Sequence, residues 1–171
     1  GTHRDPRHTE TVLRESARIV RNDRGTIISE TRHGFICANA GVDASNVPGG
    51  SGTVALLPLD SDTSARHIRQ QVLEADGVDV AVIISDTFGR PWREGATNVA
   101  IGLAGMDALM DYRGASDAYG EVLYTTMIAV ADELACAAEL VTGKLLGVPL
   151  AIIRGYDYPR GDSGARVLVR P

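Results

Sequence analysis

Two acidic phrases carry the residues of this chain that are best suited to chemistry, and both are predicted to stand where a strand ends. The more informative phrase is Ser85–Arg93, in which Asp86 and Thr87 follow the apolar run 80–84 and precede Arg90 and Arg93. Hard divalent cations prefer carboxylate and hydroxyl oxygens, and forked arginine donors suit phosphates and carboxylates. This combination indicates a metal-assisted reaction on an anionic substrate. The alternative is an ordinary strand-to-loop turn with an Asp cap and surface arginines.

The other acidic phrase is Ala40–Asn46, in which Asp43 follows a short apolar strand. An Asx turn, favoured by Ser45 and Asn46, would explain this aspartate without any function. If the two strand ends are neighbours in one sheet, however, the oxygens of Asp43, Asp86 and Thr87 could converge on one divalent cation. Both interpretations remain open on the residues alone.

Several other polar residues are weaker candidates. His33, between two short predicted strands, is expected to be a turn or hydrogen-bonding residue rather than a ligand. Asp132 and Glu133 are adjacent on a predicted helix and therefore cannot share one face. We expect Glu133 to face solvent and Asp132 to be either a buried residue or a partner of the site.

The stretch Thr142, Gly143, Lys144 contains a Gly-Lys pair of the kind found in phosphate loops. It lacks the first glycine of the Walker A pattern, and Leu145 stands where Ser or Thr is required, so it is not a Walker A motif. A generic phosphate contact from Lys144 remains a hypothesis. The chain has no G-x-S-x-G or H-E-x-x-H motif, which gives no support to serine-hydrolase or zincin chemistry.

Composition restricts the class of protein. A chain of 171 residues with 44% hydrophobic and 23% charged residues is long enough to bury a core as one domain. Its net charge of −5 argues against a nucleic-acid-binding protein. No apolar run approaches the roughly 20 residues of a membrane span. Cys37 and Cys136 are far apart, and we expect buried thiols in a reducing cytosol.

Hydrophobic periodicity predicts alternating helices and strands, which indicates α/β or α+β layering. We expect helices over 6–20, 60–75 and 124–146, and strands over 26–30, 35–38, 54–58, 78–84 and 150–153. The strand over 78–84 is near-continuously apolar and is expected to be covered on both faces. Residues 99–105 are predicted to be a strand or extended, and 107–121 a long loop.

Eight short motifs, in order along nearly the whole chain, closely resemble the coenzyme F420-0:L-glutamate ligase family, the gamma-glutamyl ligases of coenzyme F420 biosynthesis. The motifs lie at His33–Phe35, Ala40–Val47, Leu57–Asp62, Ser85–Arg93, Ala100–Gly102, Asp111–Gly114, Ala131–Ala135 and Arg154–Gly155. The resemblance implies a mixed α/β fold of the α+β class, with a layered sheet and packed helices. It also implies a single ligase-like domain over 1–171.

The resemblance also implies roles for individual residues. Asp43 and Asp86 would hold one divalent cation, Mn²⁺ or Mg²⁺, and Thr87 would help to hold a second, with K⁺ as a further candidate ion. Asn46 would contact GTP, and the family makes further nucleotide contacts where Thr142, Gly143 and Lys144 stand. Some archaeal members place an acidic ligand at 143 or 144, where this chain has no carboxylate. Arg90 and Arg93 are our candidates for a phosphate or carboxylate clamp.

The activity implied by the resemblance is a GTP-dependent, cytoplasmic and homodimeric ligase. It would add L-glutamate to the tail of F420-0, or of its dehydro form, through an acyl phosphate. Family members usually carry further residues at both ends, and some a nitroreductase-like domain, so this sequence is expected to lack terminal segments. Two alternatives remain open: a binding-competent but inactive fragment, and a metal-dependent phosphatase or nucleotide hydrolase.

Overall fold

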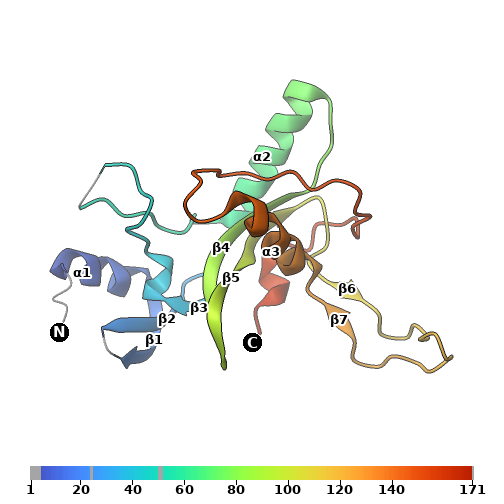
Figure 1. The fold of residues 1–171 in the computed structure, drawn as a ribbon, viewed down its shortest axis with the longest axis horizontal. Helices are drawn as coiled ribbons and strands as arrows, with labels where there is room; N and C mark the ends of the chain where they lie inside the picture. Colours follow the sequence, from blue (N-terminus) through green and yellow to red (C-terminus); the bar gives the residue numbers. More distant parts are fainter. Residues whose placement is uncertain (1–4, 24, 50–51, 171) are drawn as a thin grey trace. The chain divides into compact units, whose positions relative to one another are not determined.

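The computed structural model of the chain describes residues 5–23, 25–49 and 52–170, which form a mixed α+β fold (Figure 1). Three small sheets occur in this part of the chain: β1-β2-β3, β4-β5 and β6-β7. The elements, in chain order, are α1 Pro6–Glu15, β1 Ser16–Asp23, β2 Thr26–Thr31, β3 Ile36–Ala38, η1 Asn39–Gly41, α2 Ser61–Asp76, β4 Val82–Arg90, β5 Arg93–Ala104, β6 Met110–Asp111, β7 Met127–Ile128, α3 Val130–Thr142 and η2 Ala165–Leu168. None of these helices is both long and apolar enough to cross a membrane.

The chain divides into two compact units, and the two paired strands β4 and β5 contribute to both. Unit 1 comprises Gly1–Asp60 and Phe88–Gly95, and unit 2 comprises Ser61–Thr87 and Ala96–Pro171. Of the predicted site residues, Asp43, Asn46, Arg90 and Arg93 therefore belong to unit 1. Asp86, Thr87 and the stretch 142–144 belong to unit 2.

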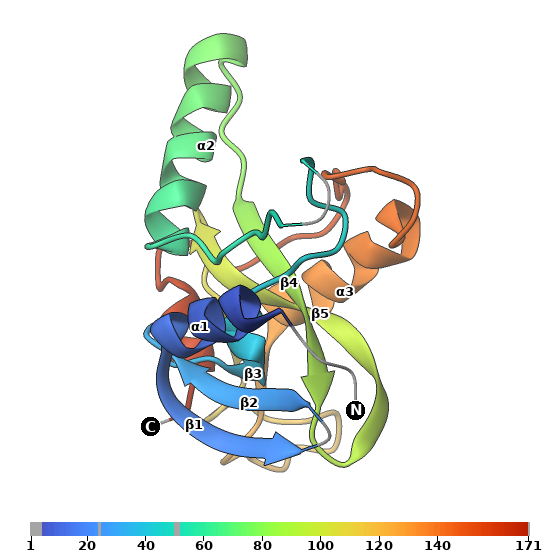
Figure 2. The same ribbon diagram turned by 90° about the vertical axis from the view of Figure 1, so that its left-hand side faces the viewer.

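Unit 1 packs helix α1 with the antiparallel sheet β1-β2-β3 (Figure 2). Its small core contains Val12, Ala40 and Val42, against which Ile27 and Val54 pack. Helix α1 begins at Pro6, whose fixed φ suits the first helical position. The carboxylate of Asp5 caps the helix by accepting a hydrogen bond of 2.9 Å from the backbone N–H of Arg7.

The helix predicted over 6–20 is wrong beyond Glu15. Ser16 has extended backbone angles, φ −86° and ψ 130°, and the chain continues as β1. The β-branched residues Ile19 and Val20 favour a strand. Arg18 also forms a cross-strand ion pair of 2.8 Å with Glu30 of β2. Strand pairing therefore overrides the weak helical periodicity in this segment.

Unit 2 is built around the inner part of β5, where every residue from Ala100 to Ala104 is buried. The core combines β5 with the start of α3 and with η2, and its buried members are Ala100, Leu103, Met106, Ala108, Val130, Ala131 and Ala165. Helix α3 lies beside β5 in both views of the ribbon (Figures 1 and 2). The small buried residues Ala131 and Ala135 of α3 permit this close approach.

Asp62, in the first turn of α2, ties three elements of unit 2 together. One carboxylate oxygen accepts the backbone N–H of Leu103 at 2.8 Å and that of Ala165 at 3.0 Å. The adjacent Ser61 lies directly against Gly102 of β5, where an added Cβ would be 2.4 Å from the Ser61 carbonyl oxygen. Residues of two family-like motifs, Leu57–Asp62 and Ala100–Gly102, are therefore in contact where the start of α2 packs on β5.

Several predicted elements are confirmed and others need correction. The strands at 26–30 and 35–38, the helix at 60–75 and the strand at 99–105 correspond to β2, β3, α2 and β5. Residues 54–58 form no strand, because only Ala55 makes a bridge, with Asp43. Residues 150–153 also form no strand. The predicted loop 107–121 contains β6 and a bridge between Ser116 and Val122.

The long helix predicted over 124–146 is shorter at both ends. Met127 and Ile128 pair with β6 as strand β7, so the helix begins only at Val130. It ends at Thr142 because Gly143 adopts a positive φ of 57° and its N–H bonds to the Glu139 carbonyl at 2.9 Å. A glycine in this conformation is a common helix stop, and it ends the helix four residues before the predicted end at Leu146.

The strand predicted over 78–84 differs from expectation in both extent and burial. It runs from Val82 to Arg90, and Val82, Ile83 and Ile84 are each only half-buried rather than covered on both faces. Pro91 and Trp92 connect it directly to β5, so residues 86–93 are not a loop. Asp86 consequently lies within a strand rather than at its end.

Candidate functional site

Asp43, in unit 1, is an exposed carboxylate held by its own turn. Its backbone N–H and C=O pair with Ala55 at 3.1 and 2.8 Å. Its Oδ1 accepts the backbone N–H and the hydroxyl of Ser45, both at 2.7 Å, and its Oδ2 lies 2.9 Å from the same hydroxyl. The Asx turn considered from the sequence is therefore present. An ionised carboxylate has about four acceptor positions, and its oxygens are of the type that hard cations prefer.

Two other residues of the same motif, Gly41 and Asn46, determine the backbone conformation on either side of Asp43. Gly41 has a positive φ of 71°, and a Cβ there would lie 2.7 Å from the Leu57 side chain. Asn46 also has a positive φ, 55°, a conformation in which asparagine is enriched. The glycine and asparagine of this phrase are thus explained by backbone geometry, whatever else Asn46 contacts.

Asp86 and Thr87, in unit 2, lie side by side on β4 with alternating exposure. Asp86 is half-buried and Thr87 is exposed, as expected for neighbours on opposite faces of a strand. The carboxylate Oδ1 of Asp86 accepts the N–H of Thr87 at 2.8 Å. The Thr87 hydroxyl donates to the side-chain oxygen of Asn98, on β5, at 2.7 Å.

Asn98, the hydrogen-bond partner of Thr87, is a residue of the candidate site that sequence reasoning missed. A strand pair joined by Pro91 and Trp92 brings residues shortly after the turn back beside residues shortly before it. The signal in the sequence is therefore the two-residue connection Pro91-Trp92 between two extended segments.

Arg90 and Arg93 differ in how they are held within unit 1. The guanidinium of Arg90 donates to the carbonyl of Glu94 at 2.7 Å and to that of Gly95 at 3.3 Å, which closes the turn between β4 and β5. Arg93 is exposed at the start of β5. Arg90 therefore has a structural role in the hairpin, and Arg93 is the more accessible of the two for an anion.

Thr142 and Gly143 take part in ending helix α3. The Thr142 hydroxyl donates to the Ala138 carbonyl at 3.3 Å, and the Gly143 N–H bonds to Glu139. The carboxyl end of a helix carries partial negative charge, which disfavours phosphate. Of the predicted nucleotide contacts in this stretch, the exposed Lys144 is the one with a charge suited to a phosphate.

Other family-like motifs have structural partners. In unit 1, His33 stacks on Phe35 with ring centroids 5.9 Å apart, and its Nε2 lies 2.8 Å from the Pro58 carbonyl. Phe35 meets Phe88 edge-to-face at 5.9 Å. The expected hydrogen-bonding role of His33 is confirmed.

The Asp111–Gly114 and Ala131–Ala135 motifs, both in unit 2, are also accounted for by local contacts. Arg113 donates to both carboxylate oxygens of Asp111, and these bonds lower the pKa of Asp111 to about 2. Asp132 accepts the backbone N–H of Ala100 at 2.8 Å, and burial raises the pKa of its carboxyl above the usual value. Asp132 is only half-buried, and its carboxylate is bonded to β5, while Glu133 faces solvent, as predicted.

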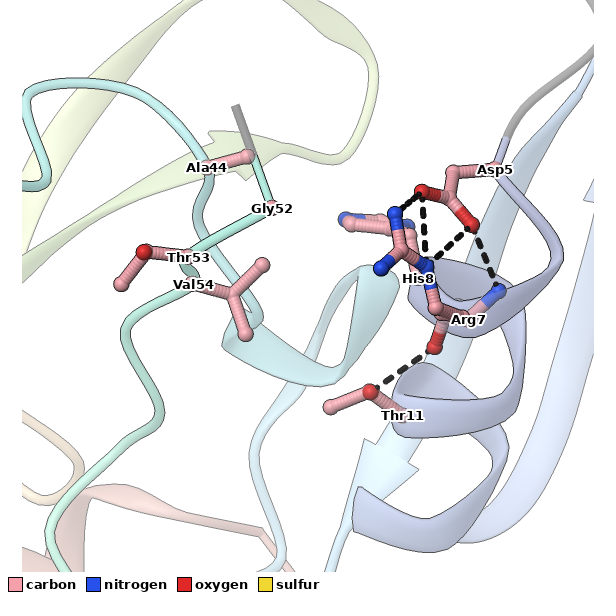
Figure 3. A pocket seen from close by; sticks show the side chains of 8 residues that line it. All are labelled: Asp5, Arg7, His8, Thr11, Ala44, Gly52, Thr53 and Val54. Carbon is pink, nitrogen blue, oxygen red and sulfur yellow. Dashed lines mark hydrogen bonds and ion pairs between the residues drawn. The ribbon is translucent and has the colours of Figure 1, made fainter. Parts of the chain in front are cut away.

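A cavity of about 430 Å³ lies in unit 1 between the start of α1 and the loop that follows Asp43 (Figure 3). Its lining residues are Asp5, Arg7, His8, Thr11, Ala44, Gly52, Thr53 and Val54. The charges of Asp5 and Arg7 are paired with each other, and the Thr11 hydroxyl donates to the Arg7 carbonyl at 2.9 Å. The charges of the Asp5 and Arg7 side chains therefore offset each other at this cavity.

The donor chemistry of the predicted ligands suits a hard cation. Asp43, Asp86 and Thr87 offer only oxygen atoms, which Mg²⁺ and Mn²⁺ prefer over softer metals. Among the described residues, no three His, Cys, Asp or Glu side chains gather as a metal site. Mg²⁺ is typically bound by one or two carboxylates together with substrate phosphates, and the carboxylate and hydroxyl oxygens of these residues are donors of the type that such an ion takes.

Comparisons with known proteins agree with the motifs. The family model described as F420-0:Gamma-glutamyl ligase matches residues 1–155. Among curated proteins named coenzyme F420:L-glutamate ligase, that of Methanothermobacter thermautotrophicus is 53% identical over 99% of this chain and 68% of its own length. Those of Methanocaldococcus jannaschii and Methanopyrus kandleri are 45% and 49% identical over the same shares. The chain therefore belongs to the F420-0:gamma-glutamyl ligase family.

Proposed function

We propose that this chain catalyses the GTP-dependent addition of L-glutamate to the tail of F420-0, or of its dehydro form, through an amide bond. The observation that carries the proposal is the identity of 42–53% to proteins named coenzyme F420:L-glutamate ligase over nearly the whole chain. The oxygen donors of Asp43, Asp86 and Thr87 support it, because a reaction of nucleotide phosphates commonly uses Mg²⁺ or Mn²⁺.

The chemical logic begins with the acceptor carboxylate, which is a poor electrophile. Transfer of the γ-phosphoryl group of GTP to a carboxylate oxygen gives an acyl phosphate and GDP. The amine of L-glutamate then attacks the acyl carbon, the C–O bond to phosphate breaks, and the amine loses a proton. The sum is GTP, acceptor and glutamate giving GDP, inorganic phosphate and the amide. No covalent attachment to the protein is required.

In this proposal Asp43 and Asp86 hold one divalent cation, Thr87 helps to hold a second, and K⁺ is a further candidate ion. Bound cations would neutralise charge on the phosphate oxygens. Asn46 and the stretch 142–144 contact the nucleotide, with Lys144 supplying positive charge. Arg93 binds a substrate phosphate or carboxylate, and Arg90 positions it by holding the β4–β5 turn. We also place the reaction in the cytoplasm, where GTP is available, and in a homodimer.

The test is the dependence of GTP consumption on the other two substrates. We expect GDP to form only when both F420-0 and L-glutamate are present, with one GDP for each glutamate added, measured by chromatography and by the mass shift of the acceptor. GTP consumption at an equal rate without glutamate and acceptor would instead identify a nucleotide hydrolase. Binding of GTP with no turnover under any condition would identify a binding-only chain.

A further inference from the structure

Asn98 contacts a proposed cation ligand without itself being assigned any role. It lies on β5 within unit 2, and its side-chain oxygen accepts the Thr87 hydroxyl hydrogen at 2.7 Å. Thr87 is exposed, whereas Asn98 is half-buried. The acceptor is thus the more firmly enclosed member of the pair, and the hydroxyl is the member that solvent or a ligand can reach.

The backbone around Asn98 is fixed from the side of α3. The carbonyl of Asn98 accepts a hydrogen bond from the Cys136 thiol at 3.1 Å, and two residues later the Ala100 N–H donates to Asp132 at 2.8 Å. Cys136 and Asp132 are four residues apart, so they lie on one face of the helix. Both bonds go to β5, and Ala100 is buried in the core of unit 2. Asn98 is therefore held on a rigid stretch of strand.

This contact determines what the Thr87 hydroxyl can offer to a ligand. A hydroxyl has one hydrogen to donate and two lone pairs. When the hydrogen is given to Asn98, it cannot point toward a cation, and the lone pairs face other directions. A threonine without such an acceptor can rotate its hydrogen toward the ligand, where it would repel a positive ion.

We propose that Asn98 is a positioning residue, which orients the Thr87 hydroxyl so that its lone pairs bind a divalent cation. The inference rests on the proposed function, in which Thr87 helps to hold the second cation. Outer-shell partners of metal ligands typically change metal affinity by about 10–100-fold when they are replaced. An effect of that size is expected here on cation binding itself.

The experiment measures Mn²⁺ binding in the presence of GDP, so that no turnover is needed, by electron paramagnetic resonance of free Mn²⁺. Asn98→Leu removes the acceptor at similar size and is expected to weaken the second Mn²⁺ by about 10–100-fold. Thr87→Val should weaken the same ion, and the double variant should be no weaker than Thr87→Val. Asn98→Asp keeps an acceptor oxygen and should bind Mn²⁺ at least as tightly as the wild type.

The control is Asn22→Leu, which makes the same substitution on the exposed strand β1 and should leave Mn²⁺ binding unchanged. Circular dichroism verifies folding. If Asn98→Leu is unstable, Asn98→Gln is used in its place, because the longer side chain moves the acceptor oxygen away from the Thr87 hydroxyl. If Mn²⁺ binding is unchanged in Asn98→Leu, or in Asn98→Gln where that variant is used, but weakened in Thr87→Val, the inference is overturned and the proposed function stands. Unchanged binding in Thr87→Val and Asp86→Asn would overturn both.

Discussion

Asp86→Asn is expected to lower glutamate ligation by more than about 100-fold, beyond the effect typical of an outer-shell residue. The substitution removes the charge of a proposed cation ligand while it preserves the shape of the side chain. The asparagine oxygen can still accept the Thr87 N–H, which the aspartate accepts at 2.8 Å. Folding should therefore be retained. Single-turnover formation of the glutamylated product, followed by mass spectrometry, measures the loss.

A matched control is Asp76→Asn, which removes a carboxylate at the exposed end of α2 in the same unit. It should retain wild-type turnover, and thermal unfolding should be similar in both variants and the wild type. Turnover close to wild type in Asp86→Asn would exclude Asp86 as a cation ligand in the reaction.

Gly102→Ala is expected to lower the free energy of unfolding by about 3 kcal/mol or more, the upper range for overpacking in a core. The added Cβ would lie 2.4 Å from the carbonyl oxygen of Ser61 and 2.5 Å from its carbonyl carbon. These are backbone atoms at the start of α2, and they cannot move unless the helix moves. Such a shift would also disturb Asp62, which accepts the Leu103 N–H from the same strand. Urea unfolding measures the change.

Gly89→Ala is the paired control, because Gly89 is also a strand glycine but has no atom within 4 Å of an added Cβ. Its free energy of unfolding should change by less than about 1 kcal/mol, since replacing a glycine where alanine fits is mildly favourable. Equal unfolding midpoints for the two variants would show that α2 does not pack against Gly102 as described.

The fold was predictable where local pattern and tertiary contacts agree. Helix α2 and strands β2 and β3 have clear periodicity, and they form close to the expected positions. Prediction failed for residues 16–20, where charged and apolar residues fit a helix but pairing with β2 decides the structure. It also failed at the end of α3, where the single backbone conformation of Gly143 stops the helix.

The sequence predicts the donor chemistry of the candidate site, but it does not predict which residues lie beside the candidate ligands. The residue types of Asp86 and Thr87 indicate oxygen ligands, yet their place within β4 depends on the turn at Pro91 and Trp92. Trp92 has a positive φ of 57°, which is rare for a bulky residue and is not signalled by the sequence. Asn98 is eleven positions from Thr87 in the sequence, and only this turn brings the two side chains into contact.

Isotope transfer tests the proposed ligase chemistry most directly. F420-0 is supplied with ¹⁸O in its terminal carboxylate, together with GTP, L-glutamate and Mg²⁺, and the released phosphate is analysed by mass spectrometry. If an acyl phosphate forms, one acceptor oxygen leaves with the phosphoryl group, so each glutamate added should yield one ¹⁸O-labelled phosphate. Release of unlabelled phosphate during product formation would contradict the account, because the phosphate oxygen would then have come from water.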